Sequence, residues 1–480
     1  MSDRSAQDYI DEQPVWRDGT AVAETPMTAM QWRIWWLAAA GKFFEGHVVF
    51  MTGVALPLIA REFSIDAVQH GMVSAATLFG ILVGALALGG MADRFGRRPM
   101  FIAEMVMFIV FLCLLVVTPN FVWLVACLFG LGLALGCDYP TAHLIISESI
   151  PSRVRGRLVL AAFGFQALGA LCGTGVGFLV LRSMPTEDAW RWMYGSAIVP
   201  AVVIAIFRLT VTESGPWLLQ RGRTDFAEEE LRRLLRRTPP YPKEVVLTAP
   251  ATGSAGGTGR GYAALFEGRT LRATVLASVP WFLQDLGTYG IGIFTPTILA
   301  SAVGHKAQHA HSLSALIHND EIAARGAALI DVLLIVGIVA AVLLADRVGR
   351  VRLQVIGFVG CAAGLLLASF ATDADGHARM LPLFFGFMLF NFMTNLGPNA
   401  QTYLLAGEVF PTRIRGIGAG FAAAFAKVGA VMTAFLFPVL LADIGTANLL
   451  YILIAASLVG AAVTWLFRIE TTGVNLDKMQ

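Results

Sequence analysis

Long apolar runs alternate with short polar connections along almost the whole chain. A helix needs about 20 mostly apolar residues to cross hydrocarbon about 30 Å thick. Twelve runs reach that length, at approximately 32–60, 70–92, 99–118, 121–145, 157–181, 192–212, 272–300, 323–345, 351–371, 381–404, 415–442 and 446–467. The pattern predicts an all-α membrane protein with twelve transmembrane helices.

One long polar break divides the twelve runs into six and six. Its first part is amphipathic and basic, from Phe226 to Arg237, with Leu231, Leu234 and Leu235 on one face; a Pro/Gly/Ala/Thr-rich tract follows at 238–261. We expect a surface helix that is solvated or faces lipid headgroups, followed by a flexible linker. The predicted parts are an N-terminal tail (1–31), a six-helix bundle (32–212), a linker with an amphipathic helix (213–271), a second six-helix bundle (272–467) and a C-terminal tail (468–480).

Charge fits this picture and adds an orientation. Of the 480 residues 56% are hydrophobic and only 14% are charged, against about 25% charged in soluble proteins. The net charge of +2 gives no reason to expect a nucleic-acid partner. Arginines gather in alternate connections, which by the positive-inside rule face the cytoplasm together with both tails. We therefore expect a multi-pass protein of the cell membrane. Its expected partners are the lipid bilayer and its substrates, and we expect it to be a monomer.

Two motifs occur once in each half of the chain. ADRFGR at 92–97 recurs as ADRVGR at 345–350, and ESIPSRVRG at 148–156 recurs as EVFPTRIRG at 408–416. Two motifs repeated at nearly one spacing indicate an internal duplication. Parallel repeats suit alternating access around a site near the middle of the membrane.

The segment GGMADRFGRR at 89–98 resembles the signature loop between helices 2 and 3 of the major facilitator superfamily, and the resemblance extends over essentially the whole chain. It implies the two-bundle fold of that superfamily. It also implies a gating role for charged residues of this motif and of its repeat, namely Asp93, Arg94, Arg97, Arg98, Asp346, Arg347 and Arg350.

Charged residues inside the predicted spans are candidates for function, because each costs at least about 2.5 kcal/mol at the centre of a membrane. We identify Lys42, Glu45, Asp138, Asp285, Asp331 and Lys427. In the seventh span, Trp281, Asp285 and Tyr289 recur every four residues, so they share one face of the helix.

These residues are similar to the pattern of phosphate:H⁺ symporters within the superfamily. The matching elements are Asp-Tyr-Pro at 138–140, Gln166, the stripe of the seventh span, Gly-Pro-Asn at 397–399 and Lys427. The resemblance implies that phosphate binds Tyr139, Gln166, Trp281, Asp285, Tyr289 and Asn399, that Lys427 compensates its charge, and that Glu45, Asp138 and Asp285 take part in proton coupling. The chain departs from that pattern at His47–Val48, where a second acid is expected, and at Leu128, where many proton-coupled relatives carry an arginine.

The chemistry of these side chains supports an anion site independently. An anion deep in a membrane needs a cation and several neutral donors. Lys427 supplies the charge, and Gln166, Asn399, the tyrosines and the Trp281 indole supply donors. An acid beside the anion, such as Asp285, would have to be protonated before the anion binds, which couples a proton to the anion.

Simpler roles remain open for several of these residues. Trp281 and Tyr289 can be packing aromatics, and Asn395 and Asn399 can join helices by hydrogen bonds worth about 0.6 kcal/mol. Lys42 lies one turn before Glu45 and can simply pair with it. Asp331 has no counterpart in the family pattern, so a structural hydrogen bond is as plausible as a function, and His47 is a candidate for coupling.

We predict a secondary active transporter that imports an inorganic anion such as phosphate with protons, by alternating access. An alternative substrate is a small organic solute, either an aromatic or other carboxylic acid or a sugar, because 212–219 also resembles the sugar-porter branch. A receptor or scaffold without transport is the alternative of another class. No nucleophile–base pair, metal constellation or nucleotide-binding loop is evident, so we expect no enzyme activity, no metal and no cofactor.

Overall fold

A computed structural model describes residues 5–12, 26–88, 91–236, 247, 261–304, 313–371, 379–410 and 414–471. Every element in these ranges is a helix. In chain order the helices are α1 (Ala6–Asp11), α2 (Ala29–Phe63), α3 (Ala67–Ala87), α4 (Met91–Phe95), α5 (Arg97–Val116), α6 (Phe121–Ser149), α7 (Ser152–Phe163), α8 (Phe165–Ser183), α9 (Ala189–Gly195), α10 (Ile198–Arg208), α11 (Gly215–Gln220), α12 (Thr224–Leu234), η1 (Gly261–Phe266), α13 (Gly268–Gly304), α14 (Leu313–Val348), α15 (Arg350–Ser369), α16 (Met380–Leu396), α17 (Pro398–Glu408) and α18 (Arg415–Leu466).

The long helices correspond to the twelve predicted spans. In the described residues, ten stretches of helix are long and apolar enough to cross a membrane. One of them, Ile417–Leu466, contains a break at Gly445, where φ is 74°, and so covers the last two predicted spans. Helix α13 covers the predicted span 272–300, which is outside those ten stretches. The predicted all-α membrane fold is confirmed.

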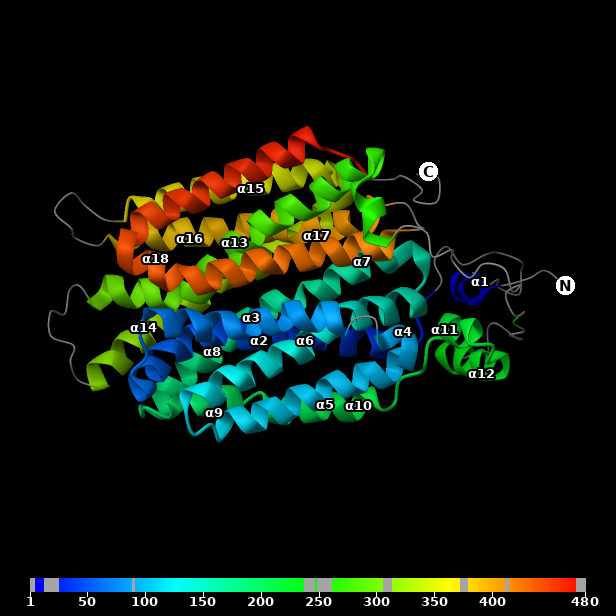
Figure 1. Ribbon diagram of the computed structural model, residues 1–480, viewed down its shortest axis with the longest axis horizontal. Helices are drawn as coiled ribbons and strands as arrows, with labels where there is room; N and C mark the ends of the chain where they lie inside the picture. The colour runs from blue at the N-terminus through cyan, green and yellow to red at the C-terminus, as the bar shows by residue number, and fades with distance from the viewer. Residues whose placement is uncertain are drawn as a thin grey trace.

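The two halves of the chain form two bundles that lie side by side (Figure 1). Helices α2 to α10 make the first half and α13 to α18 the second. Helices α1, α11 and α12 lie together at one end of the molecule, which we call the tail end, and the opposite end is the far end (Figure 1). The halves meet along α2 and α13, α3 and α18, and α8 and α14.

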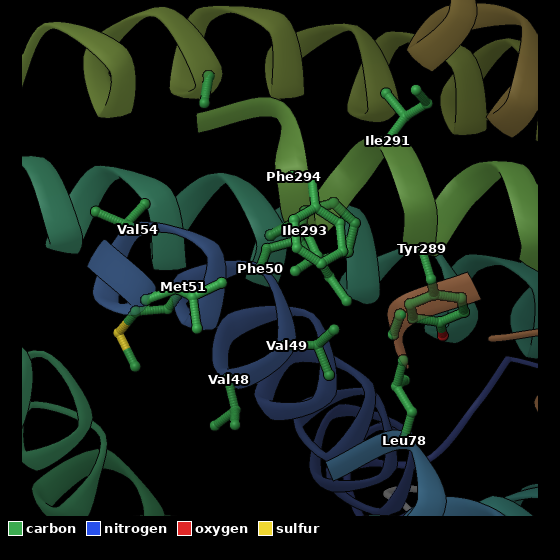
Figure 2. Packing of buried hydrophobic residues seen from close by; sticks show 14 of the residues in the cluster. Val48, Val49, Phe50, Met51, Val54, Leu78, Tyr289, Ile291, Ile293 and Phe294 are labelled. Atoms are coloured by element: carbon green, nitrogen blue, oxygen red, sulfur yellow. The ribbon is translucent and has the colours of Figure 1, made fainter. Parts of the chain in front are cut away.

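Apolar side chains of α2 and α13 form much of the contact between the halves. Val49 and Phe50 of α2 lie near Ile293 and Phe294 of α13, and Tyr289 lies at the edge of this group (Figure 2). Phe294 is 1% exposed and stacks on Phe437 of α18 with ring centroids 4.6 Å apart. This core places the polar residues of α2 and α13 in the middle of the bundle.

The amphipathic helix after the first half is packed against the protein. Leu231, Leu234 and Leu235 are buried, and the Thr28 hydroxyl at the start of α2 donates to the Leu234 carbonyl oxygen at 2.6 Å. The expectation of a solvated or lipid-facing helix is therefore wrong for this apolar face, because α11 and the start of α2 offer it a closer apolar surface. The predicted flexible tract at 238–261 lies almost wholly outside the described residues.

Candidate functional site

The Glu45 carboxylate is the centre of a buried polar cluster shared by the two halves. Its Oε1 accepts hydrogen bonds from the Tyr139 hydroxyl at 2.6 Å, the Gln166 amide at 3.1 Å and the Tyr289 hydroxyl at 3.1 Å. Gln166 also donates to the Tyr289 hydroxyl oxygen at 3.0 Å. Three predicted substrate donors thus converge on a carboxylate of the protein itself.

Two lysines and a second carboxylate complete this cluster. Lys427 Nζ donates to the Tyr289 hydroxyl oxygen at 2.7 Å and to Asp285 Oδ2 at 3.2 Å, and it lies 3.8 Å from Glu45 Oε1. Lys42 Nζ lies 3.3 Å from Glu45 Oε2 and over the Tyr139 ring. We call the following residues the Glu45 cluster: Lys42, Glu45, Tyr139, Gln166, Asp285, Tyr289 and Lys427.

The backbone explains why these side chains meet. Gly46 follows Glu45, and a Cβ at Gly46 would lie 2.0 Å from the Gln166 carbonyl oxygen. Only glycine therefore lets α2 and α8 approach closely enough to bring Glu45 and Gln166 together. On α13, Asp285 and Tyr289 are one turn apart and both reach Lys427, as their four-residue spacing predicts.

Charges inside the Glu45 cluster balance when all four groups are ionised. Lys42 and Lys427 oppose Glu45 and Asp285, and each of the four is at most 4% exposed. Buried ions of this kind are stable only when they are paired. An additional anion can enter without an uncompensated charge only if one carboxylate takes up a proton.

Two residues of the predicted substrate site contact residues outside the Glu45 cluster. Asn399 donates to the Asn395 side-chain oxygen at 2.6 Å, and Asn395 donates to the Leu334 carbonyl oxygen at 2.8 Å. Trp281 lies edge-on to Tyr403 of α17, with centroids 6.0 Å apart. In this arrangement the two asparagines join helices of the second half, and a role for Asn399 or Trp281 in binding substrate stays a prediction.

Aromatic rings from both halves meet on the tail side of the Glu45 cluster. Tyr403 stacks on Phe163 of α7 at 4.6 Å and lies edge-on to His143 of α6 at 6.4 Å. His143 is one turn nearer the tail end than Tyr139. These contacts connect the halves, but they leave His143 exposed.

Asp138 belongs to a different ionic group. The Arg208 guanidinium donates to Asp138 Oδ1 at 3.0 Å and to Glu104 Oε1 at 2.6 Å, and also to the carbonyl oxygens of Phe101 and Leu37. We call Glu104, Asp138 and Arg208 the Arg208 triad; all three lie in the first half and are almost fully buried. With one cation and two carboxylates, its charge balances only when one carboxyl group carries a proton.

Sequence reasoning overlooked Glu104 and Arg208. Both fall inside predicted spans, at 99–118 and 192–212, and their charge in such runs was the signal that would have identified them.

His47 is buried and stacks on Phe43 with centroids 5.8 Å apart. Its ring nitrogens make no hydrogen bond within the described chain.

The repeated motifs form matching ion pairs at the tail end. Arg97 binds Glu148 with two nitrogens, at 3.0 and 2.9 Å, and Arg350 binds Glu408 likewise, at 2.6 and 3.0 Å. Ser214 donates to Glu148, and Thr471 donates to Glu408 at 2.5 Å. Each pair joins helices within one half, so the duplication seen in sequence is also a duplication of structure.

Two further acids, Glu213 and Glu470, bind the backbone beside these ion pairs, and the sequence motifs predicted no role for them. Glu213 accepts from the backbone N–H groups of Arg97 and Arg98, and Glu470 accepts from that of Arg350. Burial raises the pKa of Glu213, although the Ser214 amide and the two arginine amides act in the opposite direction.

The other predicted gating residues are placed as follows. Arg98 donates to the Leu209 carbonyl oxygen at 2.6 Å, and the Arg94 carbonyl oxygen accepts from Arg221. Arg94 and Arg347 are exposed. The side chains of Asp93 and Asp346 lie outside the described residues, and gating by this set stays a prediction.

Two repeated helical bundles that share a buried ionic site define a secondary transporter of the major facilitator fold. The family model of sugar (and other) transporters matches residues 34–480, so the chain belongs to that family. Membership makes it a multi-pass membrane transporter rather than an enzyme.

The names of similar proteins refer to different solutes. The putative metabolite transport protein YaaU of Escherichia coli is 26% identical over 92% of this chain and 93% of its own length. The niacin transporter NiaP of Acinetobacter baylyi is 25% identical over 95% and 98%. A putative inorganic phosphate transporter of Schizosaccharomyces pombe is 27% identical over 94% and 88%.

Solved structures agree on the fold. A structure of the proton:xylose symporter XylE with a bound bromo-deoxyglucose matches this chain with a TM-score of 0.73 at 21% identity, over 94% of this chain and 98% of that one. This similarity concerns the fold alone.

Proposed function

We propose that the protein imports a small inorganic anion such as phosphate together with protons, by alternating access. The observation that carries the proposal is the position of Glu45, whose carboxylate accepts hydrogen bonds from Tyr139, Gln166 and Tyr289. The donor set of an anion site is therefore present, and an internal anion occupies it.

Protonation of Glu45 exchanges this internal anion for the substrate. A neutral carboxyl group is a weaker acceptor, and it no longer compensates Lys42 and Lys427. The three donors and Lys427 can then turn to the substrate. Because the cluster is neutral before binding, each negative charge that enters requires about one proton on Glu45 or Asp285.

The site also explains why binding would favour closure of the two halves. Glu45, Tyr139 and Gln166 come from the first half, whereas Asp285, Tyr289 and Lys427 come from the second. An anion held by donors from both halves binds the closed state more tightly than the open one, which shifts the population toward closure. The tail end is then the cytoplasmic end, in keeping with its arginine-rich connections.

An organic carboxylate is the second candidate substrate. A carboxylate and a phosphate monoanion use the same cation and the same neutral donors. The Tyr403 ring stacks on Phe163 of the first half and lies edge-on to Trp281 of its own half, and an apolar or aromatic tail could pack against these rings. The niacin transporter among the relatives adds weight to this candidate.

Uptake into proteoliposomes with an imposed pH gradient tests the proposal. Labelled phosphate, nicotinate, benzoate and xylose are compared at acidic and neutral outside pH. We expect accumulation of one of the anions only when the outside is acidic, and no gradient-driven accumulation in Glu45→Gln. Xylose accumulation without anion accumulation contradicts the proposal.

A matched control is available on the same helix. Glu62→Gln removes the carboxylate that pairs with Arg191 at 2.6 Å near the far end of α2, away from the cluster. This variant should keep the pH-driven uptake of the unaltered protein.

A further inference from the structure

Asp331 is a buried acid at the contact between the two halves that the Glu45 cluster does not include. It lies on α14 in the second half and is 3% exposed. Its Oδ2 is 3.1 Å from the Thr174 hydroxyl oxygen of α8 in the first half, and its Oδ1 accepts from the Asn391 amide of α16 at 3.2 Å. Asp331 therefore takes part in a direct polar contact between the halves.

The partners of Asp331 differ from those of the other interface acids. Glu45 and Asp285 each lie against a lysine. Among the described residues, Asp331 hydrogen-bonds to the neutral side chains of Thr174 and Asn391 and takes part in no ion pair. A carboxylate buried without a cation is costly, so this environment favours the neutral acid.

The Thr174 hydroxyl oxygen is well placed to accept a hydrogen bond from a neutral Asp331. Its hydroxyl oxygen lies 3.1 Å from the Ala170 and Leu171 carbonyl oxygens as well as from Asp331. A hydroxyl group has one proton to donate and two lone pairs to accept. When Thr174 donates to the backbone, a protonated Asp331 can donate to Thr174, and every group is satisfied without a buried charge.

Asp331 is separated from the Glu45 cluster along the helix axis. Thr174 follows Gln166 by eight residues, which at 1.5 Å per residue is about 12 Å toward the far end. At the same level Gly53 of α2 meets α13, where a Cβ would lie 2.0 Å from the Ile293 carbonyl oxygen. The halves are thus in backbone contact on the side where Asp331 lies.

We propose that Asp331 is a second proton-binding site, whose protonation permits the two halves to close at the far end. When the far end opens, water reaches the Thr174–Asp331 contact and the acid can ionise. When it closes, water is expelled and the acid must bind a proton. Closure therefore takes up a proton without any substrate, so the inference goes beyond the proposed anion transport and does not depend on it.

The test measures far-end closure in the substrate-free protein reconstituted in lipid nanodiscs. Spin labels at Val68 of α3 and Leu436 of α18, both exposed near the Gly71–Phe435 contact, report the separation of the halves, in a Cys113→Ser background that removes the exposed native thiol. Because one proton is taken up, the closed-to-open ratio should rise by up to about tenfold per unit fall in pH.

Two variants and a control decide the outcome. Asp331→Asn should stay closed from pH 5 to pH 8. Thr174→Val keeps the acid but removes its partner, so it should still respond to pH while needing a lower pH to close. Asp443→Asn, at an exposed acid of α18, should behave as the unaltered protein. The proposal is overturned if Asp331→Asn closes and opens with pH as the unaltered protein does. If Asp331→Asn does not fold, the proposal is overturned if Thr174→Val closes at the same pH as the unaltered protein. A failure of anion binding does not affect this proposal.

Discussion

The Glu45 cluster and the Arg208 triad are both buried ionic networks, yet they differ in how they relate to the halves of the molecule. The triad draws Glu104, Asp138 and Arg208 from the first half alone. The Glu45 cluster includes Tyr289 and Lys427 from the second half. When one half moves against the other, the contacts of the triad stay intact, whereas the contacts of the Glu45 cluster between the halves break. Changes in the triad should therefore affect the stability of the protein, and changes in the Glu45 cluster should affect transport.

The largest expected effect is on folding, from Arg208→Met. Removal of the guanidinium leaves Glu104 and Asp138 buried without a cation, and breaking a buried ion pair costs about 3–5 kcal/mol. We expect a strong loss of folded protein, measured by thermal unfolding in detergent. Adding Glu104→Gln and Asp138→Asn to this variant should restore much of the stability, and an Arg208→Met protein as stable as the original contradicts the role of the triad.

Lys427→Gln should weaken anion binding, and with it transport. This lysine is the positive charge that the second half contributes to the site. Hydrogen bonds to charged groups contribute about 1.5–3 kcal/mol. Loss of that contribution corresponds to a roughly 10- to 100-fold weaker affinity. Equilibrium binding of the transported anion measures this, and tight binding to Lys427→Gln would show that another cation holds the anion.

Glu45→Gln should separate binding from coupling. The amide keeps the shape of the side chain but carries no charge, so the lysines remain available at every pH. We expect exchange of labelled anion across the membrane to continue, with uphill uptake lost and the dependence of affinity on pH removed. Retained uphill uptake would assign the coupling proton to Asp285 or the Arg208 triad.

The smallest effect on anion affinity is expected from the removal of a single hydroxyl group. Tyr139→Phe removes one donor from Glu45 or substrate, worth about 1 kcal/mol, or a roughly fivefold loss of affinity. The control is Tyr194→Phe, whose hydroxyl pairs with Thr52 within the first half at 2.7 Å. Equal losses of affinity in the two variants would remove the distinction between the cluster and the rest of the first half.

Local pattern predicted the fold, whereas the candidate site residues came from the resemblance to phosphate:H⁺ symporters and from the charged residues inside the spans. Span length gave the helices, and the four-residue spacing on α13 placed Asp285 and Tyr289 on the same face. Glu45 was predicted as a coupling acid, but its position as the acceptor of three substrate donors was not. That position depends on contacts between helices remote in sequence, such as α2 with α8 at Gly46.

Other features could not be predicted from spacing alone. Glu104 and Arg208 lie 104 residues apart, and only the fold shows that they form an ion pair. Asn399 matches a substrate-binding pattern, yet Asn395, which lies just before the break between α16 and α17, offers a closer partner. The buried face of α12 depends on an apolar surface formed by α11 and by the start of α2.

Proton uptake on anion binding tests the central claim most directly, namely that Glu45 occupies the place of the substrate anion until it is protonated. Purified protein in weak buffer with a pH indicator is titrated with inorganic phosphate, and with nicotinate if phosphate does not bind. The account predicts about one proton taken up per negative charge bound, and less uptake in Glu45→Gln. Binding of the anion to the unaltered protein without proton uptake would contradict it.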